Sequence, residues 1–208
     1  MEANVVFLDF SESFDAVPHS ILLDKLSNCR MRVFRLRWLK HQLKGRAQTV
    51  VANGARSSWR PVTSAVPQGS IQGPVLLLLF VSDLDAGFEC TINQFADDTK
   101  LGGAVEGQEA LQRDLDRLDH WARINGMTLN KPKRRILRLG QSNAGHKSKL
   151  GEEWLESSPA ERHLGLLVDT RLNITQQCAL AAERANCIWG CIKHSIASQS
   201  KELIIPLY

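Results

Sequence analysis

Three aspartates lie beside short apolar stretches of this chain, and together they could hold divalent metal ions. Asp9 closes the apolar run 5–8, and Asp97 and Asp98 separate two short β-like stretches. Phosphoryl transfer is served by two ions about 3.5–4 Å apart, and Mg²⁺ usually takes one or two carboxylates. If the strands pair side by side, the three acids converge at one end of a sheet. Neighbouring residues of a strand point to opposite faces, so only one of Asp97 and Asp98 would face both ions. The other interpretation is a surface turn, because Asp-Asp is common in turns.

Several strands and helices would have to position these acids. Apolar and β-branched runs predict strands at 5–9, 91–95, 99–101 and 136–139, and Asn53-Gly54 predicts a tight hairpin turn. Residues 154–156 and 164–168 could pair as two further strands. Helical spacing predicts helices at 20–26, 33–43, 75–84, 111–124 and 175–195. This order lacks strict βαβ alternation, so we expect an α+β fold in which a sheet is layered on helices.

The helix predicted at 33–43 has an apolar stripe that we expect to face the core. This stripe consists of Val33, Phe34, Trp38, Leu39 and Leu43.

Composition excludes several classes of protein. The chain has 208 residues, a net charge of +4 and 43% hydrophobic residues, which fits an ordinary globular domain rather than a disordered or collagen-like one. The longest apolar run, 75–81, is far shorter than the ~18 residues of a membrane span. The N-terminus lacks the pattern of a signal peptide, and the five scattered cysteines form no CxxC pair. We therefore expect an intracellular protein, nuclear or cytoplasmic, without disulfides.

Positive charge is concentrated in two segments. No acid interrupts residues 30–46, and a second basic cluster lies at 131–138. Such clusters either bind a polyanion or form the solvated face of a helix. The first segment holds seven basic residues: Arg30, Arg32, Arg35, Arg37, Lys40, Lys44 and Arg46.

Five segments, in order, resemble the motifs of reverse transcriptases from non-LTR retrotransposons. The resemblance covers residues 5–168 and is closest to LINE elements of the chicken-repeat type. Residues 7–19 (FLDFSESFDAVPH) resemble motif A, 66–74 (VPQGSIQGP) motif B, 95–98 (FADD) motif C, 129–133 (LNKPK) motif D and 163–166 (HLGL) motif E.

The resemblance implies a polymerase palm and assigns roles at its metal site. Asp9 and Asp97 would be the principal ligands of two Mg²⁺ ions, with Asp98 supporting them and Phe10 offering its backbone carbonyl. Phe14 matches a steric gate, where a bulky ring clashes with the 2′-OH that distinguishes ribonucleotides; otherwise it is a core aromatic.

The remaining motifs imply contacts with nucleotide and primer. Gln68 and Gly69 would lie against the nascent base pair, although Gly69 also suits a plain turn. Lys133 is a candidate acid for the pyrophosphate leaving group, with Lys131 or an ordinary surface role as alternatives. The primer grip would be Leu164-Gly165-Leu166, which otherwise is a β-turn. The implied partners are an RNA template, a DNA primer and a deoxynucleoside triphosphate, with no membrane and an oligomeric state that the sequence leaves open. The basic segment 30–46 then becomes a candidate contact for nucleic-acid phosphates.

Departures from the family pattern leave two readings of activity. Glu12 stands where these elements usually have lysine, Gln72 and residues 77–79 depart within and after motif B, and Arg135 replaces a common cysteine. We expect a palm at 1–170 and the start of helical thumb or connection elements at 171–208, without most of the fingers and without an endonuclease domain. The chain is then either an RNA-directed DNA polymerase or an inactive palm remnant that at most binds nucleic acid.

Two other readings use residues that the motifs share or leave over. A two-metal nuclease would also use clustered acids, but it predicts no use for Phe14 or the Gln68-Gly69 loop. The helical spacing of Cys187, Cys191 and His194 could suggest a metal site. With no fourth ligand nearby, buried thiols are favoured there.

Overall fold

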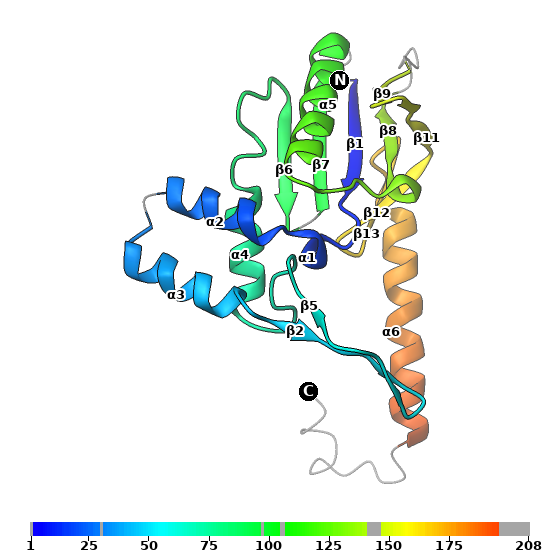
Figure 1. Ribbon diagram of the computed structural model, residues 1–208. Coiled ribbons are helices and arrows are strands. Elements are labelled where there is room, and N and C mark those ends of the chain that lie inside the picture. The colour runs from blue at the N-terminus through cyan, green and yellow to red at the C-terminus, as the bar shows by residue number, and fades with distance from the viewer. Residues whose placement is uncertain (1, 30, 97, 105–106, 141–146, 196–208) are drawn as a thin grey trace. The chain divides into compact units, whose positions relative to one another are not determined.

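A five-stranded sheet and the helices packed on it form the first of two compact units, which comprise residues 1–158 and 159–208. The computed structural model describes residues 2–29, 31–96, 98–104, 107–140 and 147–195. The sheet has the order β11-β8-β1-β7-β6 (Figure 1). Its strands are β1 (Ala3–Asp9), β6 (Thr91–Phe95), β7 (Asp98–Ala104), β8 (Arg135–Leu139) and β11 (Glu156–Ser158).

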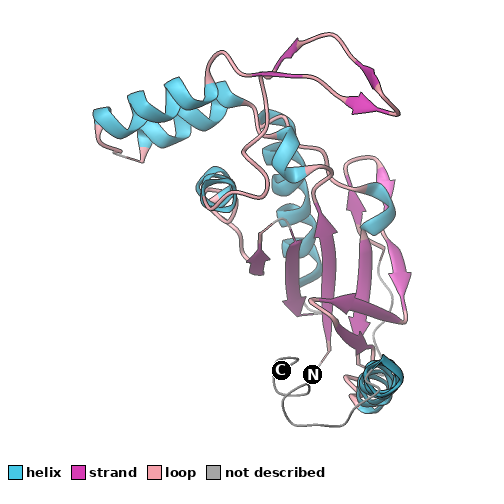
Figure 2. Ribbon diagram, turned by 90° about the horizontal axis from the view of Figure 1, so that it is seen from below, coloured by secondary structure: helices cyan, strands magenta, loops and turns pink. Residues whose placement is uncertain are grey.

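The central strand β1 is antiparallel to both of its neighbours, β7 and β8. β6 is antiparallel to β7 as a hairpin, whereas β11 runs parallel to β8. The predicted α+β class with a mainly antiparallel sheet is confirmed. Figure 2 shows the strands of this sheet side by side.

One face of the sheet forms the core because apolar side chains alternate along its strands. Val6 and Leu8 of β1 and Leu101 of β7 are buried there together with apolar residues of α4 and α5, such as Phe80 and Leu115. Phe7 and Asp9 alternate onto the other face. The helices of this unit are α1 (Ser13–Ala16), α2 (His19–Asn28), α3 (Val33–Leu43), α4 (Gln72–Val81) and α5 (Gln108–Ile124), with a 3₁₀ turn, η2, at Lys131–Lys133.

A long hairpin connects α3 to the motif B loop. The turn Asn53-Gly54 has φ angles of 50° and 80°, as the predicted tight turn requires. Its strands are β2 (Ala47–Gln48) paired with β5 (Arg60–Pro61), and β3 (Val51–Ala52) paired with β4 (Ala55–Arg56).

The predicted pairing of 154–156 with 164–168 is wrong. β10 (Glu153–Trp154) pairs instead with β9 (Lys149–Leu150), and β12 (Ala160–His163) pairs with β13 (Leu166–Asp169). These two hairpins join strands that are neighbours in the chain, because short loops close at the least entropic cost, whereas Glu156 belongs to β11, which pairs with β8.

The second unit contains the β12–β13 hairpin and α6 (Thr175–Ser195). Leu164 and Gly165 form the hairpin turn with φ angles of 47° and 82°. The Gln177 side chain accepts a hydrogen bond of 2.8 Å from the Leu167 backbone, which ties α6 to β13. The division into a palm at 1–170 and a thumb from 171 stays a prediction. Among the described residues, no helix combines the length and the apolarity that crossing a membrane would require.

Candidate active site

Asp9 and Asp98 are paired residues at the ends of two adjacent strands. The register of β1 and β7 sets Asp9 directly opposite Asp98. Directly opposed residues of an antiparallel pair share a face and have Cβ atoms about 4.5–5.5 Å apart. Asp9 is buried, with 6% of its surface exposed, and Asp98 is partly buried. Two like charges so placed repel each other, so this end of the sheet favours a cation.

Lys133 supplies a positive charge beside this pair. Its Nζ lies 2.5 Å from Oδ2 of Asp9. The backbone brings these residues together, because Asn130 N–H donates to the Asp9 carbonyl at 2.8 Å and Ser11 N–H donates to the Thr128 carbonyl at 2.7 Å. The motif D segment thereby extends along the end of β1, and η2 then directs Lys133 to the carboxylate.

Lys131, the alternative candidate, points elsewhere. Its ammonium pairs with Glu153, and Arg134 pairs with the same carboxylate at 2.6 Å. The hydrogen bond from Lys131, followed by the charges of the two cations, lowers the pKa of Glu153 below its ordinary value. Of the two candidate lysines, the structure therefore sets only Lys133 against Asp9.

A pocket of about 310 Å³ opens beside Asp9 and collects residues of motifs A, B and D. Phe10 borders it, while its ring packs in the core 5.8 Å from Trp121. Phe14 is half-buried at the wall, and its carbonyl accepts a hydrogen bond of 2.7 Å from Val66 N–H. This bond joins motif A to the motif B loop. The pocket is lined by Asp9, Phe10, Glu12, Ser13, Phe14, Asp15, Gln68, Asn130 and Lys133.

The motif B loop is tightly closed on itself. Ser70 donates its hydroxyl to the Pro67 carbonyl at 2.7 Å and accepts a hydrogen bond from Gly73 N–H at 3.1 Å. A Cβ at Gly73 would lie 2.2 Å from that same carbonyl oxygen, so only glycine fits. Gln68 reaches the pocket, whereas Gly69 is exposed at φ +75° and is not part of the lining.

Several predicted site residues are not among the described residues that line this pocket. Asp97 and Arg30 lie outside the described residues, and so does the His194 side chain. Cys187 and Cys191 are exposed, so the expected burial of these thiols is wrong. The proposed primer-grip residues belong to the second unit: Leu164, Gly165 and Leu166.

Asn130 and Ser13 line the pocket but were missed by sequence reasoning. Asn130 stands within motif D beside the lysine candidates, and that position was a usable signal. Ser13 stands within motif A between Glu12 and Phe14, which is a signal of the same kind.

The predicted inward stripe of α3 is partly wrong. Leu39 and Leu43 are buried as expected, but Val33, Phe34 and Trp38 are exposed. The basic residues of this segment that the structure describes are exposed or partly exposed: Arg32, Arg35, Arg37, Lys40, Lys44 and Arg46.

A buried carboxylate on α5 anchors the hairpin that carries Asp98. Asp114 accepts backbone N–H groups of Glu89 at 3.0 Å and of Cys90 at 2.7 Å, just before β6. Arg117 pairs with Asp114 at 2.7 Å. Glu89 is held in turn by Arg113 and Arg117, whose hydrogen bonds and charges lower its pKa from 4.5 to about 2. Burial, then the carboxylate of Asp114, raises the pKa of Cys90 to about 11.

A lysine between aromatic rings fixes α2 to α4 and α5. Lys25 lies 4.6 Å from the ring centroids of both Phe80 and Trp121. It donates to Asp83 at 2.6 Å, and Trp121 donates to the same carboxylate at 3.0 Å. Burial lowers the pKa of Lys25 despite the nearby acid. These contacts join α2, α4 and α5 through one polar cluster beside the core.

The donor set at the strand ends fits a hard divalent cation. Within the described part of the chain, no three His, Cys, Asp or Glu side chains group as a metal site. Asp9 and Asp98 nevertheless give two carboxylates on one face, which is the usual number for one Mg²⁺. The ammonium of Lys133 already occupies a cationic position at Asp9.

Comparison with protein families decides the classification. The family described as reverse transcriptase (RNA-dependent DNA polymerase) matches residues 2–168. The chain belongs to the reverse transcriptase family. This match includes all five motifs and every residue of the pocket.

Relatives of this reverse transcriptase come from mobile elements of fruit flies. The RNA-directed DNA polymerase from mobile element jockey of Drosophila funebris is 37% identical over 58% of this chain. A probable RNA-directed DNA polymerase from transposon X-element of Drosophila melanogaster is 28% identical over 97% of it. These matches cover 14% and 24% of the relatives' own lengths. They confirm the non-LTR, LINE-type assignment, whereas the chicken-repeat resemblance stays a prediction.

Solved structures with a similar fold are telomerases. The apo telomerase of Candida tropicalis superposes with a TM-score of 0.58 at 12% identity, covering 83% of this chain and 35% of that one. The telomerase of Candida albicans, solved with a fragment of telomeric RNA, gives 0.57 at 12% identity, covering 81% of this chain and 29% of its own. At this identity the likeness concerns the fold, and it agrees with the palm-like sheet.

Proposed function

We propose that this chain carries the nucleotidyl-transfer site of an RNA-directed DNA polymerase. The reaction would join a deoxynucleotide to a primer 3′-OH opposite an RNA template. The observation that carries the proposal is the register of Asp9 against Asp98, with a lysine ammonium at the buried carboxylate. Like charges held together at a strand end destabilise the fold. A cation bound between the two carboxylates would offset that repulsion.

The proposed metal ligands are Asp9, Asp97 and Asp98, assisted by the backbone carbonyl of Phe10. Two Mg²⁺ ions, when bound, would neutralise the charge that develops on the phosphate and polarise the attacking oxygen. Asp9 is buried beside the pocket and so offers a carboxylate shielded from bulk water. Carboxylate attraction for a cation is stronger in such surroundings.

The pocket residues have separate proposed roles toward the nucleotide. Phe14 would exclude a 2′-OH by steric clash, and its place in the pocket wall supports this role. Gln68 would lie against the nascent base pair, with Gly69 letting the backbone approach the template. Lys133 would give a proton to the leaving pyrophosphate, since its side chain is 63% exposed at the pocket and reaches Asp9.

Contacts to the primer and template would lie outside the pocket. Backbone groups of the turn Leu164-Gly165-Leu166 would support the primer end. The exposed basic residues around α3 would contact phosphates, because binding there releases counterions.

One observation favours a second candidate, an inactive remnant that at most binds nucleic acid. Glu12 and Asp15 line the same pocket as Asp9, and Lys133 is its one described cation. An incoming triphosphate would meet this negative charge.

Primer extension separates the two candidates. The chain, Asp9→Ala and Asp97→Ala would be compared on a DNA primer and RNA template with Mg²⁺, and Asp85→Ala, an exposed acid after α4, would be the control. The polymerase proposal expects incorporation by the chain and the control, and none by the two variants. Incorporation that survives Asp97→Ala would exclude the metal assignment. No incorporation, with salt-sensitive binding to an RNA–DNA hybrid, would identify the remnant.

A further inference from the structure

The outward face of α3 presents aromatic and basic side chains in adjacent rows. Phe34 is 79% exposed and Trp38 is 43% exposed, and Arg37 and His41 are exposed between and beyond them. Residues three or four apart on a helix are neighbours on its surface. The two rings therefore form one row, and Arg37 with His41 forms the next.

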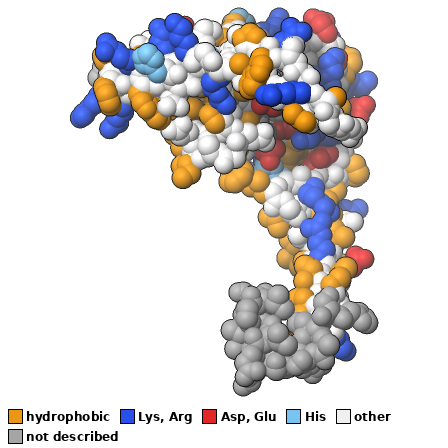
Figure 3. Space-filling model, turned by 60° about the horizontal axis from the view of Figure 1, so that its bottom comes forward, with side chains coloured by type: hydrophobic (Ala, Val, Ile, Leu, Met, Phe, Trp, Pro, Cys, Tyr) orange, Lys and Arg blue, Asp and Glu red, His pale blue; other side chains and the backbone are white. Residues whose placement is uncertain are grey.

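This face belongs to an unusually one-sided stretch of charge. Residues 25–82 contain ten Lys or Arg and no Asp or Glu, although the whole chain has a net charge of only +4. The stretch includes α3, the long hairpin and α4. On the left of the view in Figure 3, where α3 lies, basic and hydrophobic side chains share the surface. A surface with this excess of positive charge attracts a polyanion.

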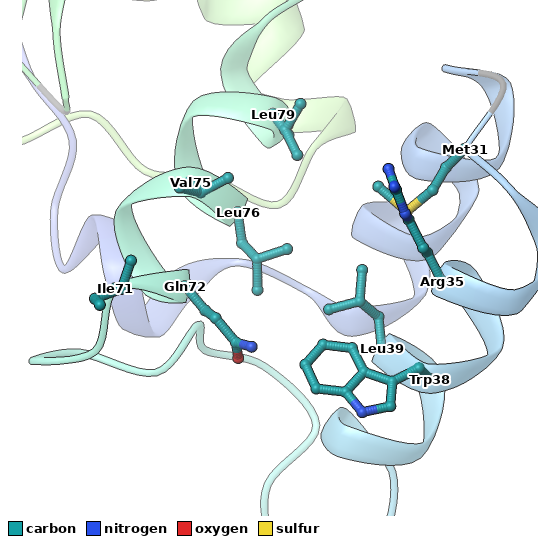
Figure 4. A pocket seen from close by; sticks show the side chains of 9 residues that line it. All are labelled: Met31, Arg35, Trp38, Leu39, Ile71, Gln72, Val75, Leu76 and Leu79. Atoms are coloured by element: carbon teal, nitrogen blue, oxygen red, sulfur yellow. The ribbon is translucent and has the colours of Figure 1, made fainter.

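An apolar hollow of about 260 Å³ adjoins the aromatic row, between α3 and α4. Figure 4 shows Trp38 and Leu39 from α3 on one side and Leu76 from α4 on the other. Trp38 thus exposes part of its indole beside a largely apolar surface, whose polar lining residues are Arg35 and Gln72. A flat aromatic ligand could stack there and bury apolar area.

A second exposed pairing of the same kind lies on the hairpin. Trp59 is exposed, and the guanidinium of Arg56 lies 5.0 Å from its ring centroid. Aromatic rings beside cations thus recur within the acid-free stretch.

We propose that the outward face of α3 binds single-stranded nucleic acid, with bases stacked on Phe34 and Trp38 and phosphates on the neighbouring cations. Aromatic platforms in basic grooves bind single strands because every base has a π-face. A duplex hides those faces, so the aromatic row distinguishes single from double strands. The inference deepens the proposed function, for which the strand would be unpaired RNA template, but binding can be measured without synthesis.

The test is fluorescence anisotropy with a labelled single-stranded RNA and an RNA–DNA hybrid of equal length, without nucleotide. The variants are Phe34→Ala, Phe34→Tyr, Arg37→Ala and the double variant Phe34→Ala/Trp38→Ala. The matched control is Trp154→Ala, which removes a ring on β10 that is 56% exposed and also lies beside a cation, Lys149 at 4.4 Å, but outside the acid-free stretch. Because Phe34 is largely exposed, its removal should leave the thermal melting temperature unchanged.

We expect Phe34→Ala to weaken single-strand binding by ~5-fold or more and to leave hybrid binding unchanged. Its slope of log affinity against log salt should equal that of the chain, because no phosphate contact is lost. Arg37→Ala should reduce that slope, while Phe34→Tyr and Trp154→Ala should bind like the chain.

Four results would overturn the proposal. The first is undiminished single-strand affinity in the double variant, and the second is an equal loss on the hybrid. The third is unchanged RNA affinity together with a lower sedimentation coefficient for Phe34→Ala, which would identify the face as a contact between protein chains. No binding of single-stranded RNA by the chain itself would have the same consequence. None of these results depends on whether the chain polymerises.

Discussion

Asp114 is the fully buried carboxylate that should contribute most to positioning the motif C hairpin. It has no exposed surface and accepts two backbone N–H groups at the start of β6 in addition to the Arg117 guanidinium. Hydrogen bonds to a charged group are worth about 1.5–3 kcal/mol each. The two backbone N–H groups lie near the surface. In a variant without the Asp114 carboxylate, water would therefore replace part of their lost hydrogen bonding.

We expect Asp114→Ala to lower the free energy of unfolding by about 3 kcal/mol, from two such bonds at the lower end of that range. For a chain of this size this corresponds to a fall of about 6–12 °C in Tm. Thermal denaturation followed by circular dichroism measures it. The matched control is Asp116→Ala, two residues along the same helix, because the Asp116 carboxylate is exposed and accepts a hydrogen bond from the neighbouring Gln112 side chain.

The control should stay within about 0.5 kcal/mol of the chain, as surface substitutions usually do. Equal melting temperatures for the two variants would refute the reasoning that Asp114 fastens the hairpin.

Two further predictions concern the motif B loop and the loss of stability at acid pH. Gly73→Ala should destabilise the chain by about 1–3 kcal/mol in urea unfolding, because its Cβ would overlap the Pro67 carbonyl oxygen; Gly190→Ala, with open space around it, should be neutral or stabilising. The pKa of Glu89 is depressed to about 2 in the folded chain, so its contribution to stability is present above pH 4.5 and is lost as the pH falls toward 2. Urea midpoints measured from pH 6 to pH 2 should therefore fall less steeply for Glu89→Gln, and parallel curves would contradict this.

The sheet and the strand ends that carry Asp9 and Asp98 could largely be predicted from the sequence. The apolar run before Asp9 and the hairpin around the Asp pair have strong local signals, and β1 and β7 pair as the motifs required. The contact of Lys133 with Asp9 could not be derived, because 124 residues separate them and a lysine alone does not reveal its partner. Only the folded backbone, through Asn130, brings them together.

The errors have identifiable physical causes. On α3, helical spacing marked an apolar arc that includes Phe34, but only Leu39 and Leu43 are buried in the core, and Leu36 packs against it partly buried. A periodic pattern gives the period of a helix and not the width of its buried face. The strands after residue 147 are two to four residues long, so their own pattern is weak. Two pairs of them, β9–β10 and β12–β13, are hairpins closed by turns such as Leu164-Gly165, and β11 pairs with the distant β8.

Binding of a divalent cation tests the central proposal most directly. Mn²⁺, a paramagnetic substitute for Mg²⁺, can be titrated into the chain, Asp9→Asn and Asp98→Asn and followed by electron paramagnetic resonance, with Asp85→Asn as the control. We predict saturable binding by the chain and the control, and affinity weakened by at least ~10-fold in the two strand-end variants, since affinity follows the ligand charge count. Equal Mn²⁺ affinity in all four proteins would contradict a metal site at the paired ends of β1 and β7.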